Sequence, residues 1–242
     1  MTKAFEISGV PSEGGVLIVV DHASNHVPDE IDLGLSPQFA NDHIAYDPGT
    51  APIARLMSQT AGYLAILGTT SRLVVDLNRY PDEPAVIQQR SDGVEIPGNH
   101  LSAEERMARI DRYFTPYHDR VRSLVHDLKP SLVLSLHSFS PTLRSDLQLK
   151  RPWDVGIMYN EYETASRFAI QFLEEESVLN VGDQRPYSGK ELNATMNRNC
   201  EAVGQHYFGL EIRQDLIMDE AGQRRFVDIL LRTCDKIRTA LA

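Results

Sequence analysis

The segment VLIVVDHASNHVPDE (residues 16–30) joins a short apolar run to an abruptly polar one. Its first five residues, VLIVV, are branched and apolar, which is typical of a buried β-strand. Asp21 and His22 follow directly, and a second histidine, His26, comes four positions later. Pro28 and the preceding strand argue against a helix here. The segment therefore predicts a buried strand that ends in a polar loop.

Further apolar runs of strand length alternate with helical patterns along the chain. The predicted strands cover residues 16–20, 63–67, 72–77, 131–136, 155–159 and 207–212. Their nearly continuous hydrophobicity is typical of a sheet that is covered on both faces. The alternation predicts an α/β protein, specifically a three-layer α/β/α sandwich. Because the 242 residues contain no repeat or linker, we expect one domain over residues 1–242.

Three helices are predicted from apolar stripes and capping signals. The clearest begins at Ser102, because Ser-Ala-Glu-Glu places Glu105 in the capping-box position. Its apolar stripe continues to Leu128 and contains Pro116, so a kink or two abutting helices are expected. A second helix is predicted over residues 162–176, and a third closes the chain. These stripes predict core packing and carry no information on function.

Composition and charge restrict the class of partner. The chain has 24 Lys and Arg against 34 Asp and Glu, a formal net charge of -10. This balance argues against nucleic-acid binding, which needs a basic surface, but a few arginines in a cleft suffice for a small anionic substrate. Cys200 and Cys234 form no CxxC motif and are expected to be free thiols. No signal-like or membrane-spanning run is present, so a cytoplasmic protein without a membrane partner is expected. The oligomeric state is left open.

Polar residues follow several predicted strands where ligands bind in α/β proteins. In open α/β sheets, ligands occupy the crevice at the carboxyl ends of the strands. The residues at these positions are Asp21 and His22, Asn78 and Arg79, His137 and Ser138, and Glu211 and Arg213. Because four separate predicted strands supply them, these residues indicate one site.

His22 and His137 occupy equivalent positions at two predicted strand ends. Two imidazoles and one carboxylate are a common ligand set of catalytic zinc, with a fourth position for water. The pair therefore predicts a site for one zinc ion or another divalent metal. The third ligand is open between Asp47, which could instead cap a helix, and Asn25. Asp47 is favoured because an amide oxygen is a poor zinc ligand, which leaves Asn25 to orient the loop or the substrate.

The other histidines have weaker settings. His26 is expected near the site without contacting the metal. Surface or packing positions are expected for His43, His100, His118, His126 and His206.

Glu211 interrupts the apolar strand FGLEI. An unpaired buried carboxylate is costly, so Glu211 needs a metal, an arginine or a catalytic task. As a general base, it would take a proton from the attacking water and pass it to the leaving nitrogen. The structural alternative is an ion pair with Arg213 or Arg72.

Arg72 and Arg79 flank the predicted strand in SRLVVDLNR. A guanidinium binds a carboxylate through two parallel hydrogen bonds, so either arginine could hold a substrate carboxylate. Arg72 could also stabilise the oxyanion of the reaction, and its structural alternative is a pair with Asp76. The residues predicted to contact substrate are Asn25, Asn78, Arg79, Ser138 and Arg213.

Five segments in a fixed order give the chain a family resemblance. They are VVDHASNHVP, HIAYDPG, SRLVVDLNR, LHSFSP and GLEIRQDL, between about residues 16 and 216. Together they resemble the N-formylglutamate amidohydrolase family, whose fold is similar to that of the zinc carboxypeptidases, with a mixed, mostly parallel sheet flanked by helices. The resemblance implies a metal-dependent hydrolase that cleaves a C–N amide bond and releases formate and glutamate from N-formylglutamate. By motif it implies metal ligands at His22, Asp47 and His137, a general base at Glu211, and a substrate pocket with Arg72, Asn78 and Arg79.

Two other functions stay open on the sequence. A carboxypeptidase-like metallopeptidase would use the same metal site with an extended groove for its substrate. A non-catalytic protein that binds a small ligand or a metal is the other, and Asn25 favours it because zinc hydrolases often have a carboxylate at that position. The expected function is a zinc-dependent amidohydrolase for a small acidic N-acyl amino acid, with N-formyl-L-glutamate as the expected substrate.

Overall fold

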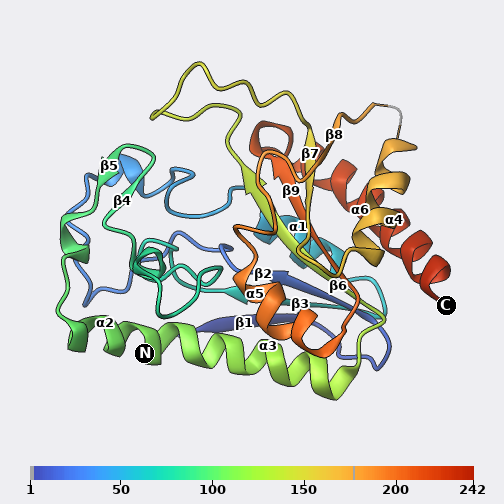
Figure 1. Cartoon of the computed structure of the whole chain (residues 1–242), viewed down its shortest axis with the longest axis horizontal. Coiled ribbons are helices and arrows are strands. Elements are labelled where there is room, and N and C mark those ends of the chain that lie inside the picture. Colours follow the sequence, from blue (N-terminus) through green and yellow to red (C-terminus); the bar gives the residue numbers. More distant parts are fainter. Residues whose placement is uncertain (1–2, 177) are drawn as a thin grey trace.

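The computed structural model describes residues 3–176 and 178–242, and a mixed β-sheet lies at its centre (Figure 1). Within the described residues the sheet has seven strands in the order β1-β3-β2-β6-β9-β7-β8. Strands β3, β2, β6 and β9 run parallel, whereas β1 and β7 are antiparallel to β3 and β9. The strands are β1 (Phe5–Gly9), β2 (Val16–Val20), β3 (Tyr63–Gly68), β6 (Leu132–Phe139), β7 (Val155–Met158), β8 (Val181–Asp183) and β9 (Tyr207–Arg213). The predicted mixed, mostly parallel sheet is thereby confirmed.

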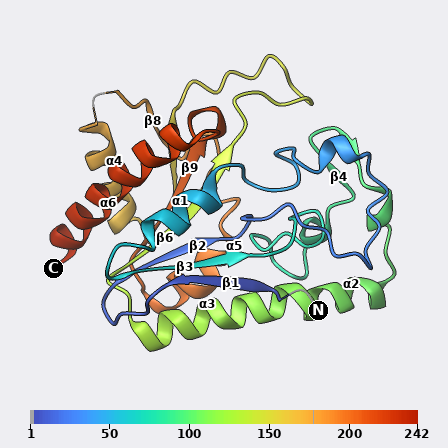
Figure 2. The same ribbon diagram turned by 180° about the vertical axis from the view of Figure 1, so that it is seen from behind.

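Helices cover both faces of this sheet (Figures 1 and 2). On one face lie α1 (Thr50–Met57), α4 (Thr164–Glu174) and α6 (Glu220–Leu241); on the other lie α2 (Ala103–Arg109), α3 (Thr115–Leu128) and α5 (Ala194–Asn199). In β2, Val16, Ile18 and Val20 join the first core, and Leu17 and Val19 join the second. Successive side chains of a strand point to opposite sides of the sheet, so a strand between two helical layers contributes to both cores. The three-layer α/β/α sandwich is confirmed.

The predicted helix from Ser102 to Leu128 is present but is not uniform. Ser102 caps it with a full capping box, in which Ser102 and Glu105 each accept from the other's backbone N–H. Between α2 and α3, residues Ile110–Phe114 form a π-helical segment, and Pro116 lies in the first turn of α3. A proline is tolerated in a first turn because its missing N–H would have no intrahelical partner there. Among the described residues, none of the helices has the length and apolar character that crossing a bilayer requires.

The prediction of a strand over residues 72–77 is wrong. This segment is irregular: its backbone bonds to other loops, from Arg72 N–H to the carbonyl of Ala45 and from Asp76 N–H to the carbonyl of Val86. Its apolar side chains, such as Val74 and Val75, are nevertheless fully buried in the second core. An apolar run indicates that its side chains are buried. Burial alone does not distinguish a strand from an irregular segment in the core.

The edge strands β1 and β8 were not predicted. Strand β1 is only partly buried, and β8 has three residues, so neither produces a long apolar run. A separate hairpin of β4 (Arg90–Ser91) and β5 (Val94–Glu95) lies outside the main sheet.

The three adjacent strands β2, β6 and β9 place the predicted site residues side by side. Because the strands are parallel, their carboxyl ends meet at one edge of the sheet. His137 and Ser138 lie within β6 instead of after it, because the pairing with β9 continues to Phe139. His137 is opposite Glu211 in this pairing. The register thus brings an imidazole and a carboxyl group together.

Candidate active site

His22, Asp47 and His137 converge at the carboxyl ends of β2 and β6. One ligand atom from each lies within 4.8 Å of the other two, and all three residues are buried. Oδ2 of Asp47 lies 3.3 Å from Nδ1 of His22 and 2.8 Å from Nδ1 of His137. The backbone N–H of Asp47 donates to the carbonyl of His22, which holds the loop before α1 against the end of β2. The three side chains predicted to bind a metal are therefore brought together.

The second ring nitrogen of each imidazole faces another buried carboxylate. Nε2 of His22 lies 2.8 Å from Oδ1 of Asp76, and Nε2 of His137 lies 3.5 Å from Oδ2 of Asp21. The hydroxyl of Tyr117 donates to the other oxygen of Asp21 at 2.8 Å. A carboxylate on Nε2 favours the tautomer in which Nδ1 carries the lone pair that a metal needs. Both lone pairs would then point toward Asp47.

Negative charge exceeds positive charge at this centre. Four buried carboxyl groups, those of Asp21, Asp47, Asp76 and Glu211, surround it. Arg72 lies among them, 2.8 Å from Asp76 and 3.4 Å from Asp47. The guanidinium of Arg72 does not by itself balance these carboxyl groups, and a divalent cation between the two Nδ1 atoms and Asp47 would add positive charge. The donor set and the charge balance fit a bound metal.

The histidine pKa values respond to the same excess of carboxylates. Burial lowers the pKa of His22, and Arg72 lowers it too, but Asp76 and Asp47 raise it above its ordinary value. Burial also lowers the pKa of His137, and Asp21 and Asp47 outweigh this to raise it well above the usual range. The buried carboxylates thus favour the protonated form of both imidazoles when no metal is bound.

Glu211 has an oxygen available for chemistry. Its Oε2 is buried and accepts no hydrogen bond from any described residue. Burial raises the pKa of Glu211 to about 7, despite the opposing influence of His137. Among the described residues it forms no ion pair with Arg72 or Arg213, so the structural alternative for Glu211 is wrong. A carboxyl group that titrates near neutrality can exchange protons during a reaction.

The metal-ligand cluster opens into a cavity of about 120 Å³. Its walls include eight of the residues predicted for the site: His22, Asp47, Arg72, Asn78, Arg79, His137, Ser138 and Glu211. Part of the Arg72 guanidinium already binds a protein carboxylate, because the ion pair with Asp76 that was predicted as its structural alternative is present. The hydroxyl of Ser138 donates to the carbonyl of Pro48 at 2.9 Å, so it holds the loop that carries Asp47.

Two residues predicted to contact substrate bond elsewhere. The side-chain amide of Asn25 donates to the carbonyl of Ala40 and to Asn41. Arg213 pairs with Asp154 at 3.1 Å and with Asp215 at 2.8 Å. Neither of them lines the catalytic cavity within the part of the chain that the structure describes. Asn25 thus holds the loop that contains Ala40 and Asn41, and Arg213 links the end of β9 to Asp154, directly before β7.

His43 lines the cavity, although the sequence placed it at the surface or in packing. It is held between two carboxylates, with Nδ1 2.9 Å from Asp42 and Nε2 3.0 Å from Asp92. Asp92 also accepts from the backbone N–H groups of Arg144 and Ser145. The only signal that could have indicated His43 is its position four residues before Asp47.

Tyr187 also lines the cavity and was not predicted. Its hydroxyl oxygen accepts a 2.8 Å hydrogen bond from Nη2 of the buried Arg151. An arginine only donates, so the hydroxyl proton of Tyr187 remains available as a donor. No pattern in the surrounding sequence, RPYSGKEL, distinguishes it from a packing tyrosine.

The family model described as N-formylglutamate amidohydrolase matches residues 14–218. The crystal structure of a gene product from Agrobacterium tumefaciens is similar with a TM-score of 0.92 and 29% identity, over 99% of this chain and 96% of that chain. N-formylglutamate amidohydrolase from Ralstonia eutropha JMP134 has a TM-score of 0.76 and 18% identity, over 98% of each chain. The CwlD amidase from Clostridioides difficile has a TM-score of 0.51 and 10% identity, over 93% of this chain and 99% of that chain, and shares the fold. None of the curated proteins matches significantly.

Proposed function

The chain belongs to the N-formylglutamate amidohydrolase family, and we propose that it is a zinc-dependent amidohydrolase that releases formate from N-formyl-L-glutamate or a closely similar acidic N-acyl amino acid. The observation that carries the proposal is that a candidate metal-ligand set, His22, Asp47 and His137, lies beside a buried carboxyl group. This group is Glu211, whose Oε2 accepts no hydrogen bond from the described residues. This combination supports a hydrolytic site, because it brings candidate metal ligands and a candidate proton acceptor into one cavity.

The metal would be held by Nδ1 of His22, Nδ1 of His137 and the carboxylate of Asp47. Zinc is proposed because two imidazoles and one carboxylate are typical ligands of its catalytic sites. When bound, zinc supplies a Lewis acid that polarises a carbonyl and lowers the pKa of water. Asp76 and Asp21 would orient the two imidazoles through their Nε2 atoms.

Glu211 is proposed as the general acid–base group. With a pKa of about 7, it is partly ionised at neutral pH and can accept a proton from the attacking water. It would then deliver that proton to the nitrogen that leaves with the amino acid. Its position opposite His137 on the neighbouring strand places the carboxyl group beside the metal ligands.

Positive and polar groups in the cavity would bind the anionic substrate. Arg79 lines the cavity and, among the described residues, donates only to the carbonyl of Asn78 through Nη1, which leaves its other N–H groups for a substrate carboxylate. The side-chain carbonyl of Asn78 accepts from the N–H of Thr195, and within the described part of the chain its amide NH2 has no acceptor, so it could donate to substrate. Arg72 would stabilise negative charge on the acyl oxygen, because it lines the same cavity.

Glu211→Gln provides the test of this function. The zinc-reconstituted protein is expected to release formate from N-formyl-L-glutamate. The variant should retain stoichiometric zinc while kcat falls by roughly 10²–10⁴-fold, because the proton acceptor is lost and the metal ligands are unchanged. Glu175→Gln, which removes an exposed carboxylate paired with Lys236, is the matched control. A reconstituted protein that hydrolyses no N-formyl or other N-acyl acidic amino acid would contradict the proposed function.

A further inference from the structure

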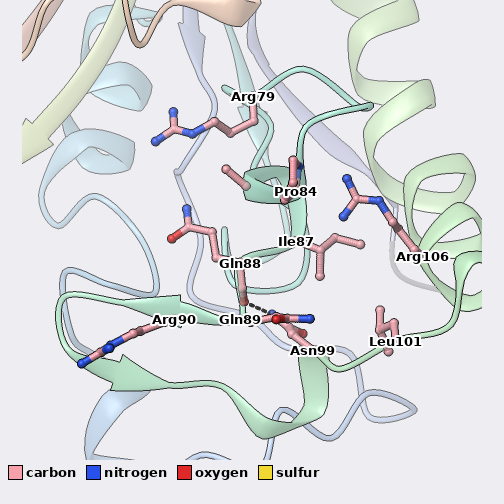
Figure 3. A pocket seen from close by; sticks show the side chains of 10 residues that line it. Arg79, Pro84, Ile87, Gln88, Gln89, Arg90, Asn99, Leu101 and Arg106 are labelled. Carbon is pink, nitrogen blue, oxygen red and sulfur yellow. Dashed lines mark hydrogen bonds between the residues drawn. The ribbon is translucent and has the colours of Figure 1, made fainter.

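A second cavity, of about 480 Å³, adjoins the catalytic one (Figure 3). It is bounded by the irregular segment after Arg79, by the strand residue Arg90, and by Asn99, Leu101 and Arg106. Arg79 lines both cavities, so it stands between them. In Figure 3, Arg79 and Gln88 extend to the same side, and Arg106 approaches from helix α2 across from them.

The walls of this cavity carry more positive than negative charge. Three arginines line it, and within the described residues no carboxylate side chain does. Arg90 pairs with Glu95 at the exposed hairpin. Arg79 and Arg106 donate only to backbone carbonyls, and neither has a carboxylate within ion-pairing distance among the described residues. In a chain with a net charge of -10, this local excess favours an anionic ligand.

The remaining walls suit an organic molecule. Pro84, Ala85, Ile87 and Leu101 provide apolar surface beside the arginines. Small-molecule pockets usually measure about 300–1,000 Å³ and combine apolar walls with a few polar groups. The second cavity falls in this range at about 480 Å³, whereas the catalytic cavity at about 120 Å³ does not. A ligand that fills both is therefore larger than an N-formyl amino acid.

Gln88 defines how the second cavity is oriented toward the metal centre. Its side-chain amide donates to Asp76 at 3.0 Å, and Asp76 lies 2.8 Å from Nε2 of His22. The cavity therefore lies behind Asp76 and beyond Arg79 when viewed from the metal ligands. If Arg79 holds the carboxyl end of the N-acyl amino acid, the cavity lies on the side of the leaving group.

We propose that the second cavity is a subsite for the leaving portion of a longer substrate, an N-acyl dipeptide whose second residue is acidic. This inference rests on the proposed function, and it extends the substrate class from acidic N-acyl amino acids to acidic N-acyl dipeptides. Arg79 faces the junction of the two residues, Arg106 binds the distal carboxylate, and the apolar wall receives the methylene groups. Arginine suits this task because it binds carboxylates through charge-assisted hydrogen bonds.

Rates with two dipeptides test the subsite. The zinc-reconstituted protein should deformylate N-formyl-L-glutamyl-L-glutamate with a kcat/KM about tenfold or more above that for N-formyl-L-glutamyl-L-alaninamide, since one charge-assisted contact is enough for this difference. Arg106→Gln should abolish the preference, mainly through KM. Arg122→Gln removes the same charge from an exposed site on α3, paired with Asp119, and should keep the preference. A wild-type protein without the preference, or equal behaviour of the two variants, would overturn the inference.

A second variant guards against a folding defect in Arg106→Gln. Ala85→Leu fills the cavity from a different wall and leaves the bonds of Arg106 intact. It should slow the acidic dipeptide at least about fivefold more than N-formyl-L-glutamate, a discrimination typical of one or two methylene groups in a pocket. Equal slowing of both substrates would contradict a subsite at this wall.

Direct binding separates this inference from the proposed function. In calorimetry, L-glutamyl-L-glutamate should bind the zinc-loaded protein, and Arg106→Gln should weaken its affinity about tenfold. If binding of L-glutamyl-L-glutamate depends on Arg106 but no N-formyl compound is hydrolysed, the subsite is supported and the proposed function is contradicted. If N-formyl-L-glutamate is hydrolysed but binding and rates are insensitive to Arg106, the proposed function stands and the subsite falls.

Discussion

Tyr187 is a residue whose hydrogen-bond partner determines what its hydroxyl can do. Arg151 donates to the hydroxyl oxygen, and the guanidinium also lies 4.9 Å from the centroid of the Tyr187 ring. Arg151 is itself buried and anchored to the carbonyl of Ser140, so it is a fixed donor. The tyrosine proton is left to face the cavity that contains Glu211. A preorganised donor of this kind contributes most where negative charge develops on a substrate.

Tyr187→Phe is expected to lower kcat/KM about 10–100-fold, the effect of losing one hydrogen bond to a charged group. The loss would fall on kcat if the hydroxyl contacts the reacting acyl group, and on KM if it contacts a substrate carboxylate. Steady-state kinetics on N-formyl-L-glutamate distinguish the two. Tyr159→Phe is the control, because it removes a hydroxyl that donates to Asp183 on the strand β8. Equal effects of the two substitutions would exclude a contact between Tyr187 and the substrate.

Helix α3 reaches the metal centre through one side chain. Tyr117 on α3 donates to Asp21 at the end of β2, and Asp21 in turn faces Nε2 of His137 on β6. This chain of contacts links three elements that are far apart in the sequence. The π-helical segment before α3 places Pro116 in a first turn, so the proline directly before Tyr117 does not interrupt the helix. The orientation of His137, a candidate metal ligand, thus depends on a helix that contributes no residue to the candidate cluster.

Asp21→Asn is expected to weaken zinc binding about 10–100-fold, because the carboxylate that orients His137 is lost. Tyr117→Phe should give a smaller loss in the same direction, since it leaves Asp21 in place but no longer fixes it. Competition with a chromophoric chelator measures both affinities. Asp183→Asn, which changes a carboxylate on β8, is the control. Zinc affinity in Asp21→Asn equal to that of the parent would mean that backbone packing alone orients His137.

At the scale of the whole molecule, the fold gathers several buried carboxyl groups at the carboxyl ends of its parallel strands. The net charge of -10 is spread over the chain, but four of its carboxyl groups are buried together around two imidazoles. Burying like charges without compensation opposes folding. A metal bound to the candidate ligand cluster, or protons in its absence, would therefore help to stabilise the folded state.

Removing the metal should make stability fall as the pH rises from about 5 to about 8. The raised pKa values of His22 and His137 stabilise the fold fully below the ordinary histidine pKa of about 6.5, and this contribution is lost as the pH rises through the folded-state values. Glu211 acts in the same direction: burial raises its pKa from 4.5 to about 7, so its ionisation over that interval costs roughly 3 kcal/mol. Melting temperatures of chelator-treated protein at several pH values measure the effect.

Two comparisons sharpen the pH prediction. The Glu211→Gln variant should show a shallower loss of stability, because one of the three titrating groups is removed. Added zinc should raise the melting temperature more at pH 8 than at pH 6, as binding must displace protons from the imidazoles. A chelated protein that becomes more stable as the pH rises would contradict the protonated metal-free centre.

The apolar runs and the residues that follow them predicted most of the fold and most of the site. VLIVV, SLVLSL and YFGLEI are strands. His22, His137 and Glu211 lie at or near their carboxyl ends, and the loop before α1 brings Asp47 to the same place. These features are local: an apolar run must be buried, and a polar residue directly after it lies at the edge of the sheet. Segment 72–77 has the same local pattern but no strand partner, so its conformation could not be predicted from composition.

The sequence alone determined the three-layer architecture and the family and indicated the candidate metal ligands, because each depends on residue chemistry and order along the chain. Only the tertiary structure decided that Asp47 faces both imidazoles, that Asn25 and Arg213 bond elsewhere, and that His43 and Tyr187 line the cavity. Arg213 is the last residue of β9 and the others lie on loops, where the direction of a side chain is set by long-range contacts such as those of Arg151 and Asp92. Local pattern fixes whether a side chain is buried, and the packing of distant segments fixes which other side chains it meets there.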